Sequence, residues 1–167
     1  RCMAGSLLMG IGDATEALRD LVVEAMDGLQ VGDSVANPEV GMGPVIDGVS
    51  RERIFKRIEQ NAAQGTSLVR DGRENIPAQG FFVGPTRFDQ VTPGHPTFCE
   101  ELFGPVLAVM HPESLDEAIK WVNRLPYGNA GTIFTSSGSA ARQFAREAEC
   151  GMIGINLGVP APMALFS

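Results

Sequence analysis

The chain has 167 residues, of which 44% are hydrophobic and 20% charged, and its net charge at pH 7 is -7. This composition is typical of a soluble globular protein of about one domain, and its acidic balance argues against a nucleic-acid partner, because no excess of cations is available to replace the counterions of phosphates. No apolar run approaches the ~20 residues that span a bilayer, so we expect no membrane partner.

Helical and strand patterns alternate along the chain, which indicates an α/β domain with a largely parallel sheet. Residues 6–9 form a short apolar run that predicts the first strand. A helix is expected next, with Asp13 and Glu16 as a capping box at its start and Gly28 as a left-handed cap at its end.

A Gly- and Pro-rich loop separates this helix from a second one, which is expected from Ser50 to near Gly65. Ser114 and Glu117 form another capping box and predict the start of a third helix. The apolar spacing over residues 141–148 predicts a fourth.

The continuous apolar run at residues 106–110 is typical of a strand that is covered on both faces. Other extended segments are expected at residues 68–69, 81–83, 132–135 and 152–155. We expect the last of these to close the sheet. Since the sequence has no internal repeat and no low-complexity segment, we assign residues 1–167 to one domain.

Familiar site motifs give little. The segment 41–46 resembles a dinucleotide-binding loop but lacks the third glycine, and Pro44 stands where a phosphate would need a backbone N–H. No P-loop, HExxH or GxSxG motif occurs. His95 and His111 both precede prolines, where we expect exposed loop histidines rather than a general base or metal ligands, and we predict no metal site.

Three cysteines, Cys2, Cys99 and Cys150, form no metal-like or paired pattern. They indicate free thiols in a reducing compartment. Arg1 is not an initiator Met, no signal peptide precedes the structured sequence, and the chain stops abruptly at Ser167. We expect both ends to be cuts within a longer protein.

Six strings, in order along the chain, resemble the motifs of the aldehyde dehydrogenase superfamily. They are RCMA at residues 1–4, VGMGPVI at 40–46, FVGPT at 82–86, EELFGPVL at 100–107, PYGN at 126–129 and GIN at 154–156. Within that superfamily, DGREN at 71–75 and GINLGVPAPM at 154–163 are similar to the methylmalonate-semialdehyde dehydrogenases. The resemblance implies the catalytic domain of that fold, with a mostly parallel twisted sheet and flanking helices.

The resemblance also implies roles for four residues. Cys2 would be the nucleophile that forms a thiohemiacetal and then a thioester, a role that suits a thiolate. Glu101 would accept hydrogen bonds from the nicotinamide ribose of NAD, and Phe103 would pack near the nicotinamide. Arg1 would bind the substrate carboxylate.

Each residue also has a simpler interpretation. Cys2 and Arg1 could be terminal residues without a role, and Glu101 a solvated charge beside Glu100. Phe103 could be a core residue before a strand. Cys99 and Cys150 have no matching role, and Asn156 is interpreted as structural.

By this resemblance the parent protein would be a homo-oligomer, a dimer or tetramer, in the bacterial cytoplasm or, as the weaker alternative, in the mitochondrial matrix. It would oxidise malonate or methylmalonate semialdehyde with NAD, lose carbon dioxide and transfer the acyl group to coenzyme A, in valine or inositol breakdown. Two alternatives stay open: a hydrolytic aldehyde dehydrogenase of other specificity, and a non-catalytic folding or interaction domain.

The family's NAD-binding domain would precede Cys2 and is absent from this sequence. We therefore expect the chain by itself to be inactive with NAD. We also expect it to self-associate through the surface that the missing domain would cover.

Overall fold

The computed structural model describes residues 4–160. They form two compact units: a larger one from Ser6 to His111, and a smaller one of residues 112–160 together with residues 4–5. The α/β class is confirmed, since helices alternate with strands and three of the four strand pairings are parallel. The assignment of residues 1–167 to one catalytic domain stays a prediction.

The larger unit is built on a four-stranded sheet in the order β1-β4-β3-β2. Its strands are β1 Leu7–Met9, β2 Ser67–Arg70, β3 Thr86–Asp89 and β4 Val106–Met110. β4 runs parallel to both β1 and β3, whereas β2 is an antiparallel edge strand. The prediction that residues 106–110 form a covered strand is confirmed, because four of the five β4 residues are buried.

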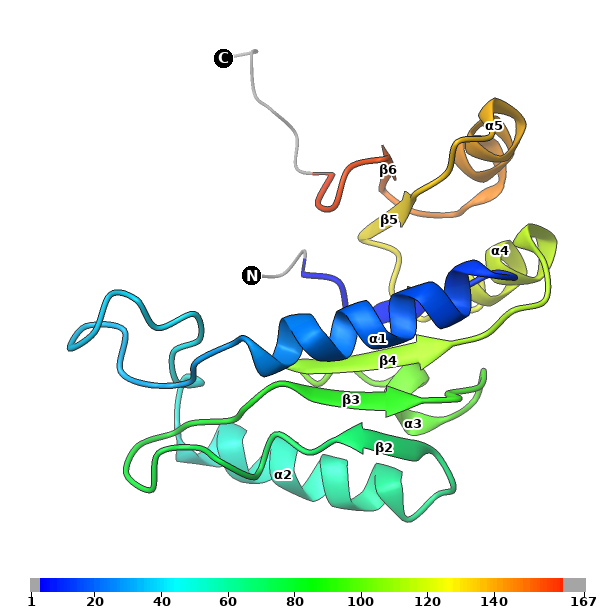
Figure 1. The fold of residues 1–167 in the computed structure, drawn as a ribbon. Coiled ribbons are helices and arrows are strands. Elements are labelled where there is room, and N and C mark those ends of the chain that lie inside the picture. Colours follow the sequence, from blue (N-terminus) through cyan, green and yellow to red (C-terminus); the bar gives the residue numbers. More distant parts are fainter. Residues whose placement is uncertain (1–3, 161–167) are drawn as a thin grey trace. The chain divides into compact units, whose positions relative to one another are not determined.

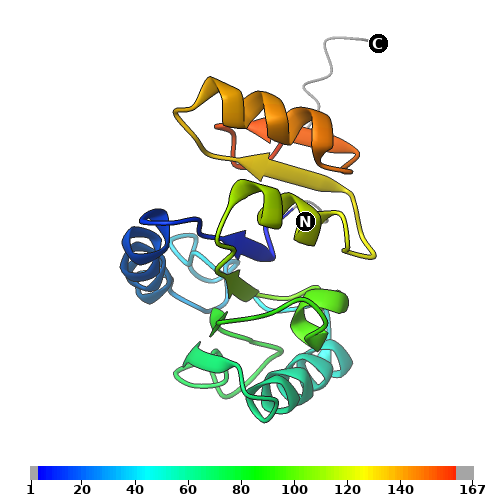
Figure 2. The same cartoon turned by 90° about the vertical axis from the view of Figure 1, so that its right-hand side faces the viewer.

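Helices cover both faces of this sheet (Figures 1 and 2). The helix α1 Ala14–Asp27 lies on one face, and α2 Gly48–Ala62 and the short α3 Pro96–Cys99 lie on the other. The apolar core of this unit comes from α2, α3, the strands and the segments between them. Its side chains are those of Ile54, Ile58, Phe82, Val83, Phe88, Val91, Phe98, Val106, Ala108, Val109 and Met110.

Three details at the helix ends differ from the sequence predictions. Asp13 precedes α1, but its side chain caps no N–H, since its own backbone is already helical. Gly28 ends α1 with a right-handed φ of -73°, because its N–H still bonds to α1 carbonyls. The second helix begins at Gly48 rather than Ser50, because Asp47 caps it by accepting a hydrogen bond of 2.7 Å from the Ser50 N–H.

Two elements of the larger unit were not predicted. Residues 81–83 form no strand, and the strand starts at Thr86, after the motif glycine and proline. α3 is a single turn that starts with Pro96, whose missing N–H is harmless at a helix start. The strand β3 was missed because its Arg87 and Asp89 are charged, although both are buried in the structure.

The smaller unit contains α4 Leu115–Val122, β5 Ala130–Ile133, α5 Gly138–Glu147 and β6 Met152–Ile155. β5 and β6 form their own parallel pair, so the prediction that residues 152–155 close a single sheet is wrong. Ser114 is confirmed as the N-cap of α4, since its Oγ accepts from the Glu117 N–H. The Glu117 carboxylate accepts from the Glu113 N–H, one residue before the Ser114 N–H that a capping box would use. β5 starts and ends two residues before the predicted strand.

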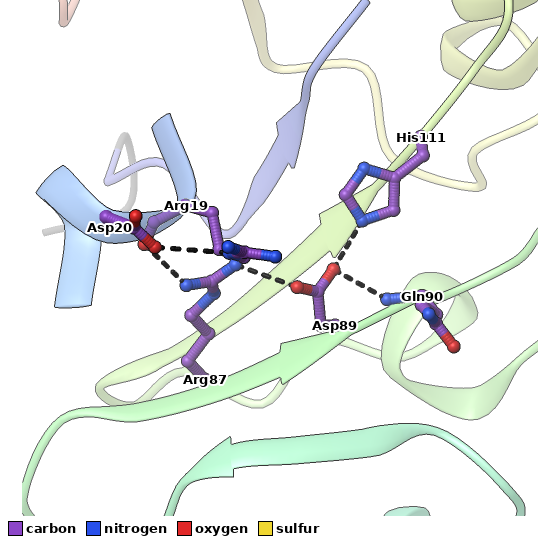
Figure 3. A network of polar contacts seen from close by, with 6 residues as sticks. All are labelled: Arg19, Asp20, Arg87, Asp89, Gln90 and His111. Carbon is purple, nitrogen blue, oxygen red and sulfur yellow. Dashed lines mark hydrogen bonds and ion pairs between the residues drawn. The ribbon is translucent and has the colours of Figure 1, made fainter. Parts of the chain in front are cut away.

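A buried polar network crosses the larger unit (Figure 3). The Arg87 guanidinium is fully buried, and it donates to the Asp89 carboxylate at 2.8 Å and to the Arg19 carbonyl of α1 at 2.8 Å. Asp89 also bonds to the His111 ring and accepts from the Gln90 N–H. The network therefore fastens α1 and the end of β4 to the central strand β3.

His111 and His95 are accordingly not the exposed loop histidines that their neighbouring prolines suggested. Both are half-buried. His111 pairs with Asp89, and the His95 Nδ1 accepts from the Thr97 N–H and caps α3. Burial lowers the pKa of His95, although the nearby Asn61 carbonyl opposes that shift.

We expect the replacement Asp89→Ala to lower the free energy of unfolding at pH 7 by about 3–5 kcal/mol, because it leaves the buried Arg87 charge without its partner. Asp20→Ala is the matched control, since it removes an exposed carboxylate that pairs with the exposed Arg19. Urea unfolding of the two variants gives the comparison. Equal midpoints would contradict a structural role for the network.

The same variants test a pH dependence. Burial raises the pKa of Asp89, but the hydrogen bonds from His111 and Gln90 and the charges of His111 and Arg87 outweigh it, so the pKa lies below its usual value. A carboxyl with a lowered folded-state pKa contributes stability above its unfolded value of about 3.9 and loses that contribution as the pH falls. The difference between the unchanged chain and Asp89→Ala should therefore shrink below about pH 4.

Candidate functional site

Two of the four predicted site residues are described by the structure. Glu101 and Phe103 lie in the segment from Glu100 to Pro105 that connects α3 to β4, the α3–β4 loop. Cys2 and Arg1 lie outside the described residues, so their roles stay predictions.

The two adjacent carboxylates of the α3–β4 loop have different surroundings. The Glu100 carboxylate forms an ion pair of 2.5 Å with the Arg57 guanidinium of α2. Glu101 is exposed, and among residues 4–160 its carboxylate forms no hydrogen bond or ion pair. Glu100 is therefore used within the protein, whereas both Glu101 oxygens are free to accept hydrogen bonds from a ligand.

Phe103 is not a core residue, in contrast to the simpler interpretation of its place before a strand. Its side chain is 63% exposed, and its backbone is left-handed with a φ of 49°. This conformation costs an L-residue roughly 1–2 kcal/mol. Exposed aromatic rings in strained backbone are found at functional sites, where surrounding structure maintains the strain.

The backbone of the loop is fixed at its C-terminal end by β3. The Thr86 N–H donates to the Pro105 carbonyl at 2.8 Å, and the Thr86 Oγ accepts from the Gly72 N–H at 3.0 Å. Gly72 lies so close to Gly84 that a Cβ on it would collide with the Gly84 carbonyl. Two of the motif strings, FVGPT and EELFGPVL, are thus joined by the hydrogen bond between the Thr86 N–H and the Pro105 carbonyl.

Residues of α2 fix the rest of the loop, and the sequence analysis missed them. The Arg53 Nη2 donates to the Leu102 carbonyl at 2.8 Å, one turn before the Arg57–Glu100 ion pair. The side chain of Ile54 fills the space beside Gly104. The spacing of Arg53 and Arg57 by four residues signals a shared helix face, but not which loop that face contacts.

The arrangement suits a ligand with hydroxyl groups and a planar ring. A free carboxylate can accept two charge-assisted hydrogen bonds from neighbouring hydroxyls. An exposed aromatic ring two residues away offers an apolar surface for a flat group. The ribose and nicotinamide of NAD have this chemistry, so Glu101 and Phe103 fit the cofactor predicted for them.

Asn156 and Asp71, which also belong to the motif strings, form hydrogen bonds within the protein. The Asn156 amide continues the β5–β6 pairing, since it accepts from the Thr135 N–H at 2.8 Å and donates to the Thr135 carbonyl at 3.1 Å. Asp71 is bound by Arg73 in the DGREN turn; this side-chain hydrogen bond lowers the pKa of Asp71 despite some burial. Burial raises the pKa of the half-buried Cys150 thiol, which makes it a poor nucleophile.

A pocket of about 480 Å³ lies elsewhere in the larger unit, between the end of α1 and the segments 70–76 and 84–85. It contains none of the predicted site residues, and its charged Asp27 and Arg70 pair with each other. Within the described chain, no group of three or more His, Cys, Asp or Glu is arranged to hold a metal. No helix among residues 4–160 is long and apolar enough to cross a membrane.

Comparison with known proteins identifies relatives of this chain. A sequence model described as the aldehyde dehydrogenase family matches residues 1–166. Malonate-semialdehyde dehydrogenase 3 of Geobacillus kaustophilus is 44% identical over 168 residues, a match that covers 99% of this chain and 34% of the relative. The chain therefore spans about a third of the length of such relatives.

Two solved structures are also similar to this chain. A methylmalonate-semialdehyde dehydrogenase from Oceanimonas doudoroffii superimposes with a TM-score of 0.93 and 40% identity, over 98% of this chain and 34% of the other. A Sinorhizobium meliloti protein, assigned as a methylmalonate-semialdehyde dehydrogenase and solved with NAD, gives a TM-score of 0.94 and 36% identity over the same shares.

The left-handed backbone of Phe103 can be tested by stability. We expect Phe103→Gly to be more stable than Phe103→Ala by about 1 kcal/mol, because both variants lose the exposed ring but only glycine adopts a positive φ without a Cβ clash. Urea midpoints of the two variants provide the measurement. An alanine variant at least as stable as the glycine variant would mean that the loop carries no such strain.

Proposed function

This chain belongs to the aldehyde dehydrogenase family, and we propose that it is the cysteine-bearing part of an NAD-dependent, coenzyme A-acylating malonate- or methylmalonate-semialdehyde dehydrogenase. The observation that carries the proposal is the α3–β4 loop, in which the Glu101 carboxylate has no partner among residues 4–160 and the Phe103 ring is exposed. The names of the bacterial relatives support the substrate class.

Cys2 is the proposed nucleophile. Its thiolate attacks the aldehyde carbon, and the carbonyl oxygen takes the negative charge of a thiohemiacetal. NAD, when bound, supplies a hydride acceptor. Loss of hydride converts the thiohemiacetal on Cys2 into a thioester, in which the same sulfur is a good leaving group for the next step.

Glu101 and Phe103 are proposed to hold the nicotinamide end of NAD. The Glu101 carboxylate would accept hydrogen bonds from the ribose hydroxyls, and the Phe103 ring would limit the positions of the nicotinamide. The segment at 41–46 lacks the third glycine of a dinucleotide-binding loop, and its Met42 pairs with Val31 through a parallel bridge. We therefore propose that a nucleotide-binding domain supplies the rest of the cofactor site.

Arg1 is proposed to select the substrate. Malonate and methylmalonate semialdehydes carry a carboxylate one carbon from the aldehyde. A guanidinium beside the nucleophile can hold such a carboxylate with two parallel hydrogen bonds. This interaction would also orient the aldehyde carbon toward Cys2.

The proposed end of the reaction follows from the substrate. A thioester with a neighbouring carboxylate loses carbon dioxide as the electrons of the breaking bond enter the thioester carbonyl. A proton replaces the carbon dioxide, and the thiol of coenzyme A then displaces the Cys2 thiolate. The products are acetyl-CoA or propionyl-CoA. We propose that the complete enzyme is a homo-oligomer of the bacterial cytoplasm.

The test is turnover by the complete enzyme with malonate semialdehyde, with and without coenzyme A. We expect NADH to form together with acetyl-CoA, and Cys2→Ala to reduce kcat by at least about 10³-fold. Cys150→Ala is the thiol control and should leave kcat within about threefold. A free acid as the product in the presence of coenzyme A would support a hydrolytic dehydrogenase, and no NADH at all would contradict the proposal.

Arg1→Leu in the complete enzyme tests the substrate. Losing a charge-assisted pair in a desolvated site costs about 2–5 kcal/mol, so kcat/KM for methylmalonate semialdehyde should fall roughly 30- to several-thousand-fold. Propanal lacks the carboxylate, and its kcat/KM should change by less than about tenfold. Equal losses for both aldehydes would show that Arg1 only supports Cys2.

A further inference from the structure

The two predicted cofactor residues of the α3–β4 loop, Glu101 and Phe103, are both exposed. Glu101 has no partner among the described residues, and Phe103 is exposed on a left-handed backbone. Within residues 4–160, no hydrogen bond or ion pair fixes the Glu101 carboxylate, and most of the Phe103 side chain is exposed. Whatever positions them must act on the residues between and beside them.

Three contacts from α2 fall on the other residues of the loop. Arg57 pairs with Glu100, and Arg53 donates to the carbonyl of Leu102. The third contact is steric: a Cβ on Gly104 would lie 2.5 Å from the Cδ1 of Ile54 and 3.3 Å from its Cγ1. The loop is thus fastened to α2 at residues 100, 102 and 104, and Glu101 and Phe103, which lie between these points in the chain, are exposed.

α2 itself is rigid at this point. Ile54 is completely buried, and so is Ile58 one turn later. Arg53, Ile54 and Arg57 belong to little more than one turn of the helix, in which the backbone is fixed by its own hydrogen bonds. A shift of the loop would have to break the Arg53 hydrogen bond and lose the close packing of Gly104 on Ile54.

We propose that Arg53 and Ile54 are positioning residues for the NAD site: through Leu102 and Gly104 they hold Glu101 and Phe103 in the geometry that receives the nicotinamide ribose and ring. The proposal rests on the function proposed above. Neither residue needs to touch the cofactor. Glycine at position 104 suits this contact, because a Cβ there would force either the completely buried Ile54 side chain or the loop to shift.

The steric contact gives a matched pair of variants. Gly104→Ala places a methyl group against Ile54 and should push the loop away from α2. Ile54→Val removes only the Cδ1 atom, so the double variant relieves the shortest contact and leaves the nearest remaining atom, Cγ1, at 3.3 Å. Gly104 has no positive φ, and alanine is therefore compatible with its backbone.

The first readout is hydrogen exchange of the peptide covering residues 100–105, measured by mass spectrometry on the complete enzyme without NAD. We expect Gly104→Ala and Arg53→Met to accelerate exchange by at least about fivefold, and the double variant Gly104→Ala/Ile54→Val to return toward the unchanged rate. Lys56→Met is the control on the same helix, since Lys56 is exposed and among the described residues forms no hydrogen bond or ion pair.

The second readout is the KM for NAD. Gly104→Ala should raise it about tenfold, with the KM for the semialdehyde within about twofold, and the double variant should recover most of the loss. A double variant no better than Gly104→Ala, or Lys56→Met equal to Arg53→Met, would overturn the positioning role. If exchange responds as expected but the unchanged enzyme does not use NAD, the proposed function fails and the contact of α2 with the loop remains.

Discussion

The larger unit depends on one short strand that is buried along its whole length. Each residue of β3 ties the strand to a different part of the unit: Thr86 to the α3–β4 loop and to Gly72, Arg87 to α1, and Asp89 to His111. Phe88 fills the core between them. A buried charged pair contributes little net stability compared with an apolar one, but removal of either partner is costly. The strand therefore fixes which segments lie together more than it adds to the total stability.

The α3–β4 loop, which carries the candidate site, is bonded to this strand. The Pro105 carbonyl bonds to β3, and residues 100, 102 and 104 are fastened to α2, so the loop is held from two directions. A ligand site gains from such preorganisation, because the cost of ordering the side chains is met during folding rather than on binding. The left-handed backbone at Phe103 is maintained in the same way.

Local patterns predicted the elements whose signals are local. The apolar run of β4 and the Ser114 N-cap of α4 are examples, because burial on both faces and a Ser–Glu spacing leave direct traces in the sequence. β3 was missed because it contains the charged Arg87 and Asp89, which are buried and pair with each other on one face of the strand. Their spacing alone does not show that both are buried. For the site, the resemblance to a family indicated Glu101 and Phe103. It did not indicate that Glu100 is paired or that α2 supports the loop, because both facts depend on contacts between residues more than forty positions apart in the chain.

The family strings are informative for a physical reason that differs from one string to the next. In FVGPT, two residues serve the backbone: Gly84 allows Gly72 to approach, and the Thr86 Oγ accepts a hydrogen bond from the Gly72 N–H. In GIN, the Asn156 side chain replaces a missing strand partner at a left-handed residue. In EELFGPVL, Glu100 and Gly104 contact α2, whereas Glu101 and Phe103 are exposed, and the Glu101 carboxylate has no partner in the described part of the chain. Residues that a protein leaves unpaired and exposed, between neighbours that are tightly held, are therefore better candidates for ligand binding than the motif as a whole.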